Sequence, residues 1–134
     1  MTTALGYTIF YVDDVEATLD FFTNSFGIAR RFITPEGEYG ELDTGATALA
    51  FAANTLAHVN LDSAGGFEPI RPDQPPVGAS VTLITSDVAG SVERATRHGA
   101  SLYLAPTDKP WGQTVAYLRD PNGILVEVAT AIGG

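Results

Sequence analysis

The stretch that decides the fold is Trp111–Val128, WGQTVAYLRDPNGILVEV, near the C-terminal end of the chain. Two segments within it, Val115–Leu118 and Ile124–Val128, are rich in β-branched, aromatic and aliphatic residues, which predicts two strands. Residues 120–123 between them, DPNG, have the chemistry of a turn, because proline presets φ and Asn-Gly accepts a positive φ. The stretch therefore predicts a β-hairpin.

A single carboxylate interrupts the second of these strands. Side chains alternate along a strand, so Leu125 and Glu127 should share one face. The opposite face then receives Ile124, Val126 and Val128. A carboxylate in such an apolar strand is costly to bury unless it is paired, protonated or bound to a metal. Glu127 is therefore the first candidate for a functional residue.

The hairpin also resembles a known family. Its Trp-Gly start, its Arg-Asp-Pro-Asn-Gly turn at 119–123 and the glutamate four residues after that glycine are similar to the closing hairpin of the vicinal oxygen chelate superfamily. That group includes glyoxalase I, extradiol dioxygenases, fosfomycin resistance enzymes and bleomycin resistance proteins, and in its enzymes the matching glutamate is usually a metal ligand. The resemblance implies an α+β fold in which two βαβββ modules form a curved mixed sheet around a concave cavity, with the helices outside.

The first half of the chain predicts one such module. Residues 7–12 form an expected strand, and residues 15–26 an expected helix, because apolar side chains recur at positions 15, 19, 22 and 26. Asp13 or Asp14 can cap this helix, and Gly27 can end it. Three further strands are expected at residues 30–34, 39–42 and 47–52.

The same order of elements recurs in the second half. Asp87 precedes a second apolar helical pattern that ends at Gly99, and it lies 73 residues after Asp14. Gly99 lies 72 residues after Gly27. A repeat of pattern at such a period indicates two equivalent modules. We expect modules at residues 4–62 and 79–131, joined by a Gly/Pro-rich linker at 63–78, within one compact domain.

The alternation of side chains, with the resemblance, assigns residues to the concave face. The expected set is Tyr7, Ile9, Tyr11, Thr47, Leu49, Phe51, Ser80, Thr82, Ile84, Val115, Tyr117, Leu125 and Glu127. An error of one residue in register would reverse any of these assignments.

The resemblance also implies where a metal would lie. In the metalloenzymes of the family four side chains hold it, typically His or Gln from the first strands and Glu from the closing strands. Counting from the helix caps and turn glycines places these positions at Tyr7, Leu49, Ser80 and Glu127. Only Glu127 is a good ligand, and metal affinity needs several matched donors. We therefore expect no metal and no other cofactor, with a divalent metal left as the open alternative.

The sequence leaves three roles open for Glu127. It could be hydrogen-bonded to Tyr7 or Ser80 as a packing element, it could anchor a cationic or hydrogen-bond-donating ligand, or it could be a metal-free catalytic acid or base with Tyr7 or Tyr11. Aromatic residues favour a binding cleft, because flat rings bind planar ligands with little loss of entropy. The expected ligand-binding residues are Tyr7, Tyr11, Phe51, Ser80, Trp111, Tyr117 and Glu127, with Trp111 on a loop at the rim.

Composition limits the classes of binding partner that are expected. The net charge of −9 argues against nucleic acid, suits a cationic ligand, and is equally explained by solubility. No apolar run approaches the roughly 18 residues that a membrane span needs, and the N-terminus has no export signal, so a cytoplasmic location is expected. His98 should end a helix, and His58 is expected at the surface or in packing, or else over the cavity mouth.

Taken together, these features predict a small-molecule (drug or metabolite) binding protein of the glyoxalase/bleomycin resistance type, without a metal, that uses Glu127 and an aromatic cleft. The alternative is a lyase or dioxygenase of the glyoxalase/extradiol dioxygenase kind, with Glu127 as metal ligand or acid/base. The resemblance implies a homodimer with clefts at the dimer interface, and the acidic, aromatic composition suits a cationic aromatic ligand.

Overall fold

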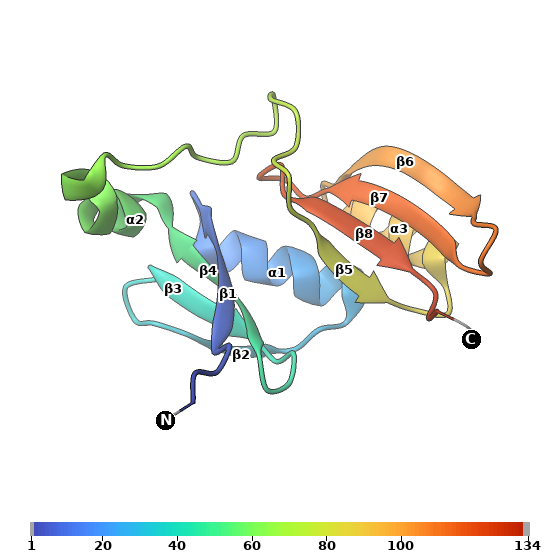
Figure 1. Cartoon of the computed structure of the whole chain (residues 1–134), viewed down its shortest axis with the longest axis horizontal. Coiled ribbons are helices and arrows are strands. Elements are labelled where there is room, and N and C mark those ends of the chain that lie inside the picture. The colour runs from blue at the N-terminus through green and yellow to red at the C-terminus, as the bar shows by residue number, and fades with distance from the viewer. Residues whose placement is uncertain (1, 133–134) are drawn as a thin grey trace. The chain divides into compact units, whose positions relative to one another are not determined.

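The computed structural model describes residues 2–132 of the chain. The chain divides into two compact units, the first made of residues up to 23 and 27–69, the second of residues 24–26 and 70 onward. Each unit contains one four-stranded sheet with both parallel and antiparallel neighbours (Figure 1).

The first unit contains four strands, two α-helices and a short 3-10 helix. Its elements in chain order are β1 (Tyr7–Val12), α1 (Val15–Phe26, whose last three residues are part of the second unit), β2 (Arg30–Ile33), β3 (Tyr39–Leu42), β4 (Ala48–Ala53), α2 (Asn54–Leu61) and η1 (Asp62–Ala64). The strand order in the sheet is β1-β4-β3-β2, and only β1 and β4 are parallel.

The second unit repeats this arrangement without the extra helices. Its elements are β5 (Val81–Ile84), α3 (Val88–Arg97), β6 (Ser101–Asp108), β7 (Thr114–Arg119) and β8 (Leu125–Ala129). The strand order is β5-β8-β7-β6, again with one parallel pair, β5 and β8. The expected α+β fold with two βαβββ modules is therefore confirmed.

The two long helices begin at the aspartates that the sequence offers as caps. The Oδ1 atom of Asp14 accepts a hydrogen bond from the backbone N–H of Ala17 at 3.0 Å, and Asp87 does the same for Gly90 at 2.9 Å. A cap accepts from the N–H three residues onward, which otherwise has no partner. Asp14, not Asp13, is thus the cap of α1, and Gly27 ends that helix with a φ of 73°.

Helix α1 covers one face of the first sheet and forms the core with it (Figure 1). The ring of Phe22 stacks on Phe51 of β4, with centroids 5.3 Å apart and planes 23° from parallel. Gly40 in β3 allows the helix to come this close, because a Cβ at that position would lie 2.6 Å from the Cδ1 atom of Leu19. The bare backbone of Gly40 is therefore a packing requirement.

This packing corrects one sequence prediction. In the β1–β4 ladder Leu49 pairs with Thr8, and Phe51 pairs with Phe10, so their side chains share the face that α1 covers. Phe51 is 0% exposed. The expectation that Leu49 and Phe51 face away from the helix is wrong. The connection from the turn glycine Gly45 to β4 is one residue longer than the matching connection before β8, which shifts the count by one.

The open face of the first sheet, defined here as the face opposite α1, carries small residues from β4 and aromatic residues from its neighbours. The β4 residues on it are Ala48, Ala50 and Ala52, which pair with Tyr7, Ile9 and Tyr11 of β1. The prediction that these three β1 residues share one face is confirmed. Thr47, the remaining residue expected there, precedes β4 and donates a hydrogen bond to the Leu5 carbonyl at 3.3 Å.

The predicted hairpin forms the β7–β8 pair of the second sheet. Asp120 accepts hydrogen bonds at Oδ1 from the backbone N–H groups of Asn122 (3.0 Å) and Ile124 (2.8 Å), which closes the turn. Asp120 is only 2% exposed. Burial raises the pKa of its carboxyl, while the bonds from Asn122, Ile124 and Gly123 act in the opposite direction. The turn thus contains a carboxylate that is buried because it organises the backbone.

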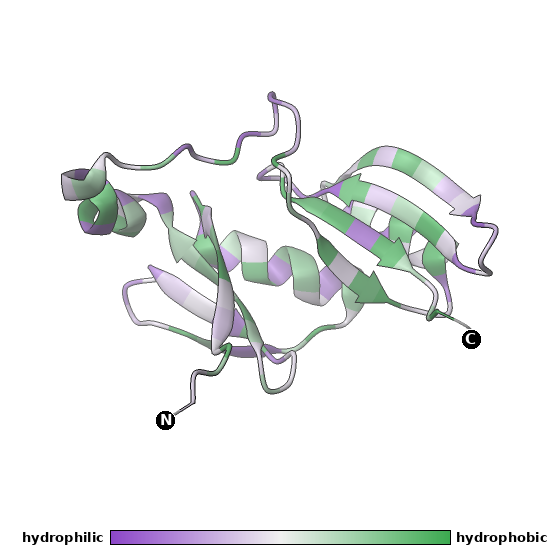
Figure 2. Ribbon diagram, viewed as in Figure 1, coloured by the Kyte–Doolittle hydropathy of each residue, from purple (hydrophilic) through white to green (hydrophobic). Residues whose placement is uncertain are grey.

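Strand β8 is hydrophobic apart from a hydrophilic band (Figure 2), which the sequence places at Glu127. Val126 and Val128 are fully buried and pair with Val81 and Leu83 of β5. Glu127 alternates with them and lies on the open face of the second sheet, the face opposite α3. This placement agrees with the sequence prediction.

The predicted linker forms no strand or helix between η1 and β5. Its second half is held to the hairpin by Arg119, whose guanidinium donates hydrogen bonds to the carbonyls of Arg71 (3.0 Å), Pro72 (3.2 Å) and Gln74 (2.6 Å). The same group also binds the carbonyl of Gly123. These hydrogen bonds therefore fix a proline-rich segment that has few hydrogen bonds of its own.

Within residues 2–132, none of the helices combines the length and the apolar character that crossing a membrane requires.

Candidate functional site

The open face of the first sheet contains a cavity of about 340 Å³. Its walls come from β1, β3 and β4 and from helix α2. The lining residues are Tyr7, Ile9, Tyr11, Tyr39, Ala52, Leu56, Ala57 and Asn60. All of them are uncharged, and three are tyrosines. The cavity is therefore an aromatic, mainly apolar site with a few polar atoms, which is the usual composition of a small-molecule site.

Local sequence explains how these side chains converge. The alternation of β1 sends Tyr7, Ile9 and Tyr11 to the same face, and the alanines opposite them on β4 leave room above the sheet. Helix α2 follows β4 directly and forms one wall. Its first residue, Asn54, donates a hydrogen bond to the Oδ1 atom of Asp13 at 2.7 Å, which ties the helix to the end of β1.

The segment after η1 packs against the same region through Phe67. Its ring lies 5.2 Å from Tyr11 and 4.6 Å from His58, measured between ring centroids. His58 is exposed on α2 and is not among the residues that line the cavity. The structure thus gives His58 a packing contact, in line with the simplest of the predicted roles.

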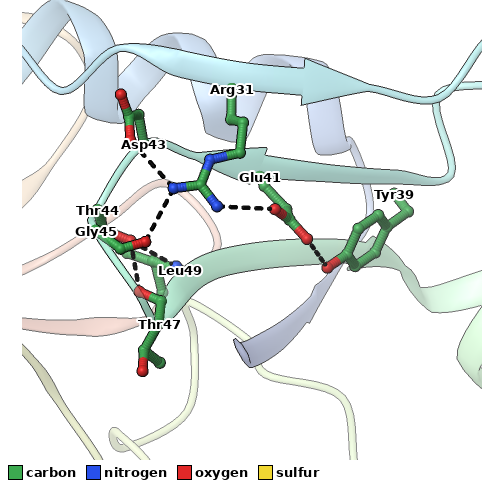
Figure 3. Close-up of polar contacts among 8 residues, drawn as sticks. All are labelled: Arg31, Tyr39, Glu41, Asp43, Thr44, Gly45, Thr47 and Leu49. Carbon is green, nitrogen blue, oxygen red and sulfur yellow. Dashed lines mark hydrogen bonds and ion pairs between the residues drawn. The ribbon is translucent and has the colours of Figure 1, made fainter. Parts of the chain in front are cut away.

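A polar network stands beside the cavity (Figure 3). The hydroxyl of Tyr39 donates a hydrogen bond to Oε2 of Glu41 at 2.6 Å. The other oxygen of Glu41 lies 3.5 Å from Nη1 of Arg31. Nη2 of Arg31 contacts Oδ1 of Asp43 at 3.1 Å and the carbonyl of Gly45 at 3.0 Å. Figure 3 shows Arg31 between the two carboxylates, with Tyr39 at the far end of the network.

The environment of Tyr39 favours its protonated form. Burial raises the pKa of the Tyr39 phenol well above its usual range, and the hydrogen bond to Glu41 and the charges of Glu41 and Tyr7 act in the same direction. The ring also meets Tyr7 edge-on at 6.1 Å and Phe32 at 5.9 Å, between centroids. Tyr39 is therefore fixed in position and keeps its proton over the physiological range.

A second pair of a phenol and a carboxylate lies on the open face of the second sheet. Oε1 of Glu127 accepts a hydrogen bond from the Thr82 hydroxyl at 2.7 Å, and Oε2 accepts one from the Tyr117 hydroxyl at 2.9 Å. The hydrogen bond to Glu127 raises the pKa of Tyr117, and burial adds to that shift. Both partners are direct neighbours of Glu127 in the ladder, which explains why they, and not Ser80, hold the carboxylate.

Comparison with known proteins now decides the family. The sequence model of the Glyoxalase/Bleomycin resistance protein/Dioxygenase superfamily matches residues 4–128. The chain belongs to this superfamily. No curated protein matches the chain.

Several solved structures have the same fold. An enzyme described as a glyoxalase/bleomycin resistance protein/dioxygenase family member from Burkholderia phytofirmans PsJN has a TM-score of 0.75 and 22% identity, with 97% of this chain and 100% of that chain covered. A glyoxalase-related enzyme from Fulvimarina pelagi has a TM-score of 0.78 and 21% identity, with 97% and 89% covered. TioX from Micromonospora sp. ML1 has a TM-score of 0.67 and 21% identity, with 96% and 98% covered. At these identities the likeness establishes the fold alone.

The metal centre that the superfamily's enzymes use does not fit the residues present here. Register makes Ala50, which pairs with Ile9, the counterpart of Glu127, which pairs with Thr82. The position counted as Leu49 is therefore wrong, and its replacement is also not a ligand. Among residues 2–132, no group of three or more His, Cys, Asp or Glu side chains is arranged to hold a metal ion. One carboxylate beside an alcohol and a phenol is a poor donor set for a divalent ion.

The predicted ligand-binding residues separate into groups. Tyr7 and Tyr11 line the cavity of the first unit, whereas Glu127 and Tyr117 belong to the second unit. Phe51 is in the core. The two remaining residues belong to neither group. Ser80 is exposed just before β5. Trp111 is 60% exposed on the β6–β7 turn, where its Nε1 donates a hydrogen bond to Oε1 of Gln113 at 2.7 Å.

Sequence reasoning missed five of the eight residues that line the cavity: Tyr39, Ala52, Leu56, Ala57 and Asn60. Leu56, Ala57 and Asn60 lie on α2, a helix whose apolar residues show little periodicity. For Tyr39 and Glu41 the sequence predicts a strand but no functional role. The signal that could have identified them is their spacing, because residues that lie two apart on a strand have their side chains on the same face.

Proposed function

We propose that this protein binds a small, planar organic molecule, a drug or a metabolite, in the tyrosine-lined cavity of its first unit. The observation that carries the proposal is the cavity itself: about 340 Å³, lined by Tyr7, Tyr11 and Tyr39 together with aliphatic side chains from β1 and α2. Ligand sites typically have volumes of roughly 300–1,000 Å³. Membership of a superfamily that includes bleomycin resistance proteins supports binding without chemical change as one activity of the fold.

The chemistry of the wall supports a planar ligand. Tyrosine rings offer large flat apolar surfaces and lose little conformational entropy on binding. Three of them around one cavity can stack on an aromatic ring or meet it edge-on, and Ile9 and Leu56 complete an apolar floor and side. The acidic charge of the whole chain, −9, favours the approach of a cation over an anion.

Glu127 enters the proposal as a recognition group on the open face of the second sheet, apart from the cavity of the first unit. A carboxylate has about four acceptor positions, and Thr82 and Tyr117 use two of them. The remaining positions can accept from a donor on a ligand. Glu127→Gln should preserve the fold and weaken binding of a cationic ligand, and Thr114→Val on β7 is a control for a polar change away from the carboxylate.

The test of the proposal is a binding screen followed by calorimetry. Planar aromatic compounds, cationic and neutral, are first screened by thermal shift, and Kd is then measured for the strongest. Tyr11→Ala should lose about 1–3 kcal/mol of binding free energy, the scale of an aromatic anchor. Tyr103→Ala, an exposed tyrosine on β6 that is absent from the cavity wall, is the matched control. Equal losses in the two variants would contradict binding in this cavity.

The superfamily resemblance adds two proposals about the assembly and the metal. We propose a homodimer, to be tested by light scattering after gel filtration, where a monomer mass near 14.1 kDa would contradict it. We also propose that binding needs no metal. Addition of EDTA should therefore leave Kd unchanged, and a loss of affinity that Zn²⁺ restores would refute this part.

A second candidate is acid–base catalysis by Glu127, in a lyase or dioxygenase of the superfamily. The observation in its favour is the carboxylate–phenol pair, in which Tyr117 can supply a proton and Glu127 can accept one. If this candidate is right, Glu127→Gln abolishes turnover of a substrate that still binds. A bound compound recovered unchanged from the wild type after prolonged incubation favours the binding function instead.

A further inference from the structure

We infer that Glu41, oriented by Arg31, turns Tyr39 into a pure hydrogen-bond acceptor toward the cavity, so that the site selects ligands that carry a protonated amine. Glu41 is then the specificity-determining residue. The inference rests on the proposed function, because it concerns the ligand class of the same cavity.

The first step is the position of the Tyr39 proton. A phenol has a single hydrogen to donate, and here it is donated to Oε2 of Glu41 at 2.6 Å. A ligand that reaches the Tyr39 oxygen therefore meets lone pairs alone. The carboxylate behind the phenol polarises it and strengthens it as an acceptor. A ligand group that can only accept, such as a carboxylate, gains nothing from this oxygen.

The second step is what holds the Glu41 side chain in place. Its side chain is only 12% exposed, and Nη1 of Arg31 lies 3.5 Å from Oε1. Arg31 is itself fixed by Asp43 and by the carbonyl of Gly45 (Figure 3). A guanidinium presents its donors in a rigid fork, so these contacts set the direction from which it approaches Glu41.

The third step is the balance of charge. One guanidinium faces two carboxylates in this network, Glu41 and Asp43, so the network carries an excess negative charge. No residue in the cavity wall is a Lys, Arg or His that could compensate it. Glu41 is mostly shielded from solvent, so salt screens its field less than that of an exposed carboxylate. A cation that contacts the Tyr39 oxygen would lie next to this uncompensated charge.

Tyr39 differs in this respect from the other two tyrosines of the wall. Among residues 2–132, the hydroxyls of Tyr7 and Tyr11 have no hydrogen-bond partner and can donate or accept according to the ligand. Their role is to supply ring surface, which also attracts a cation. Discrimination between an amine and an acid therefore depends on Tyr39 and the carboxylate behind it.

The test uses three probes on one scaffold: 2-naphthylmethylamine, which is protonated at pH 7, neutral 2-naphthylmethanol, and anionic 2-naphthoate. Kd is measured by calorimetry for the wild type, Glu41→Gln and Tyr39→Phe. Glu16→Gln is the matched control, because it removes the same charge from an exposed position on α1, the helix on the opposite face of the sheet. Circular dichroism verifies that each variant is folded.

The expected result is a preference of at least tenfold for the amine over the naphthoate in the wild type and in Glu16→Gln. Glu41→Gln should lose most of this preference and retain its affinity for the alcohol. Equal binding of the three probes to the wild type, or a preference that survives Glu41→Gln, would overturn the inference and leave the proposed function standing. If no probe binds the wild type, the proposed function fails, and the inference fails with it.

A measurement without ligand tests the same contact. Tyrosinate absorbance at 295 nm is followed against pH, and the curve of Tyr39→Phe is subtracted to isolate Tyr39. Glu41→Gln should shift the Tyr39 transition to lower pH, because the side chain that accepts the hydrogen bond from the phenol has lost its negative charge. A transition that does not move in Glu41→Gln would show that Glu41 does not accept this hydrogen bond, and would overturn the inference whatever the probes do.

Discussion

Replacing Phe51 with alanine tests which face of the first sheet packs against helix α1. Phe51 is fully buried, its ring stacks on Phe22 at 5.3 Å, and a second ring, Phe10, lies at 6.4 Å. Truncation of a buried phenylalanine typically costs about 3–5 kcal/mol, through lost burial and the cavity left behind. Because a domain of this kind has a free energy of unfolding of about 5–15 kcal/mol, the loss would be about a fifth of the total or more.

The assay is equilibrium unfolding in urea, followed by far-UV circular dichroism, with the slope m fitted for each variant. Tyr7→Ala is the control, because Tyr7 is 55% exposed and lies on the open face. It should cost about 1 kcal/mol or less. A loss below about 1 kcal/mol for Phe51→Ala, or equal losses for the two variants, would refute the assignment of Phe51 to the core.

Three further predictions concern packing, pH and the linker. Gly40→Ala should destabilise the fold by about 1–3 kcal/mol in the same assay, whereas Gly6→Ala, with open space around its Cβ, should be nearly neutral. Tyr39 has a raised pKa, so its contribution to stability is present below about pH 10 and is lost as the pH rises further; the difference in unfolding free energy between the wild type and Tyr39→Phe should therefore shrink above that pH. Arg119→Ala should speed hydrogen exchange at the amide of Gln74, and unchanged protection there would contradict the hydrogen bonds that Arg119 donates to the linker carbonyls.

The parts of the fold that the sequence predicts are those with local causes. Asp14 and Asp87 cap helices because a carboxylate there can satisfy backbone donors, and Gly27 accepts the left-handed conformation that ends α1. The DPNG turn follows equally from its residue types. These signals act over a few residues, so the order and most bounds of the elements agree with expectation.

Counting from a glycine could not show on which face of the sheet each β4 side chain lies. Its sequence, ALAFAA, is apolar throughout, and every residue of the strand is buried. Periodicity is therefore weak, and the count from Gly45 gave the wrong face. The size of Leu49 and Phe51 was the better guide, because large apolar side chains fill the layer beneath a helix while alanines leave space on the other face.

The candidate site was predicted only in part, because only some of its contacts have local causes in the sequence. The alternation of β1 is local, and it correctly puts Tyr7 and Tyr11 together. The contribution of α2 depends on how a short helix folds back over the sheet, and the link from Asn54 to Asp13 spans 41 residues of sequence. Long-range polar contacts of this kind leave no periodic trace in a sequence.

The measurement that tests binding in the tyrosine cavity most directly is ¹⁹F NMR of protein labelled with 3-fluorotyrosine. The chain has five tyrosines, and three of them line the cavity. On titration with 2-naphthylmethylamine, the resonances of Tyr7, Tyr11 and Tyr39 should shift together with one Kd, while that of Tyr103 stays in place. Shifts confined to Tyr103 or Tyr117, or no shift at saturating probe, would contradict the account.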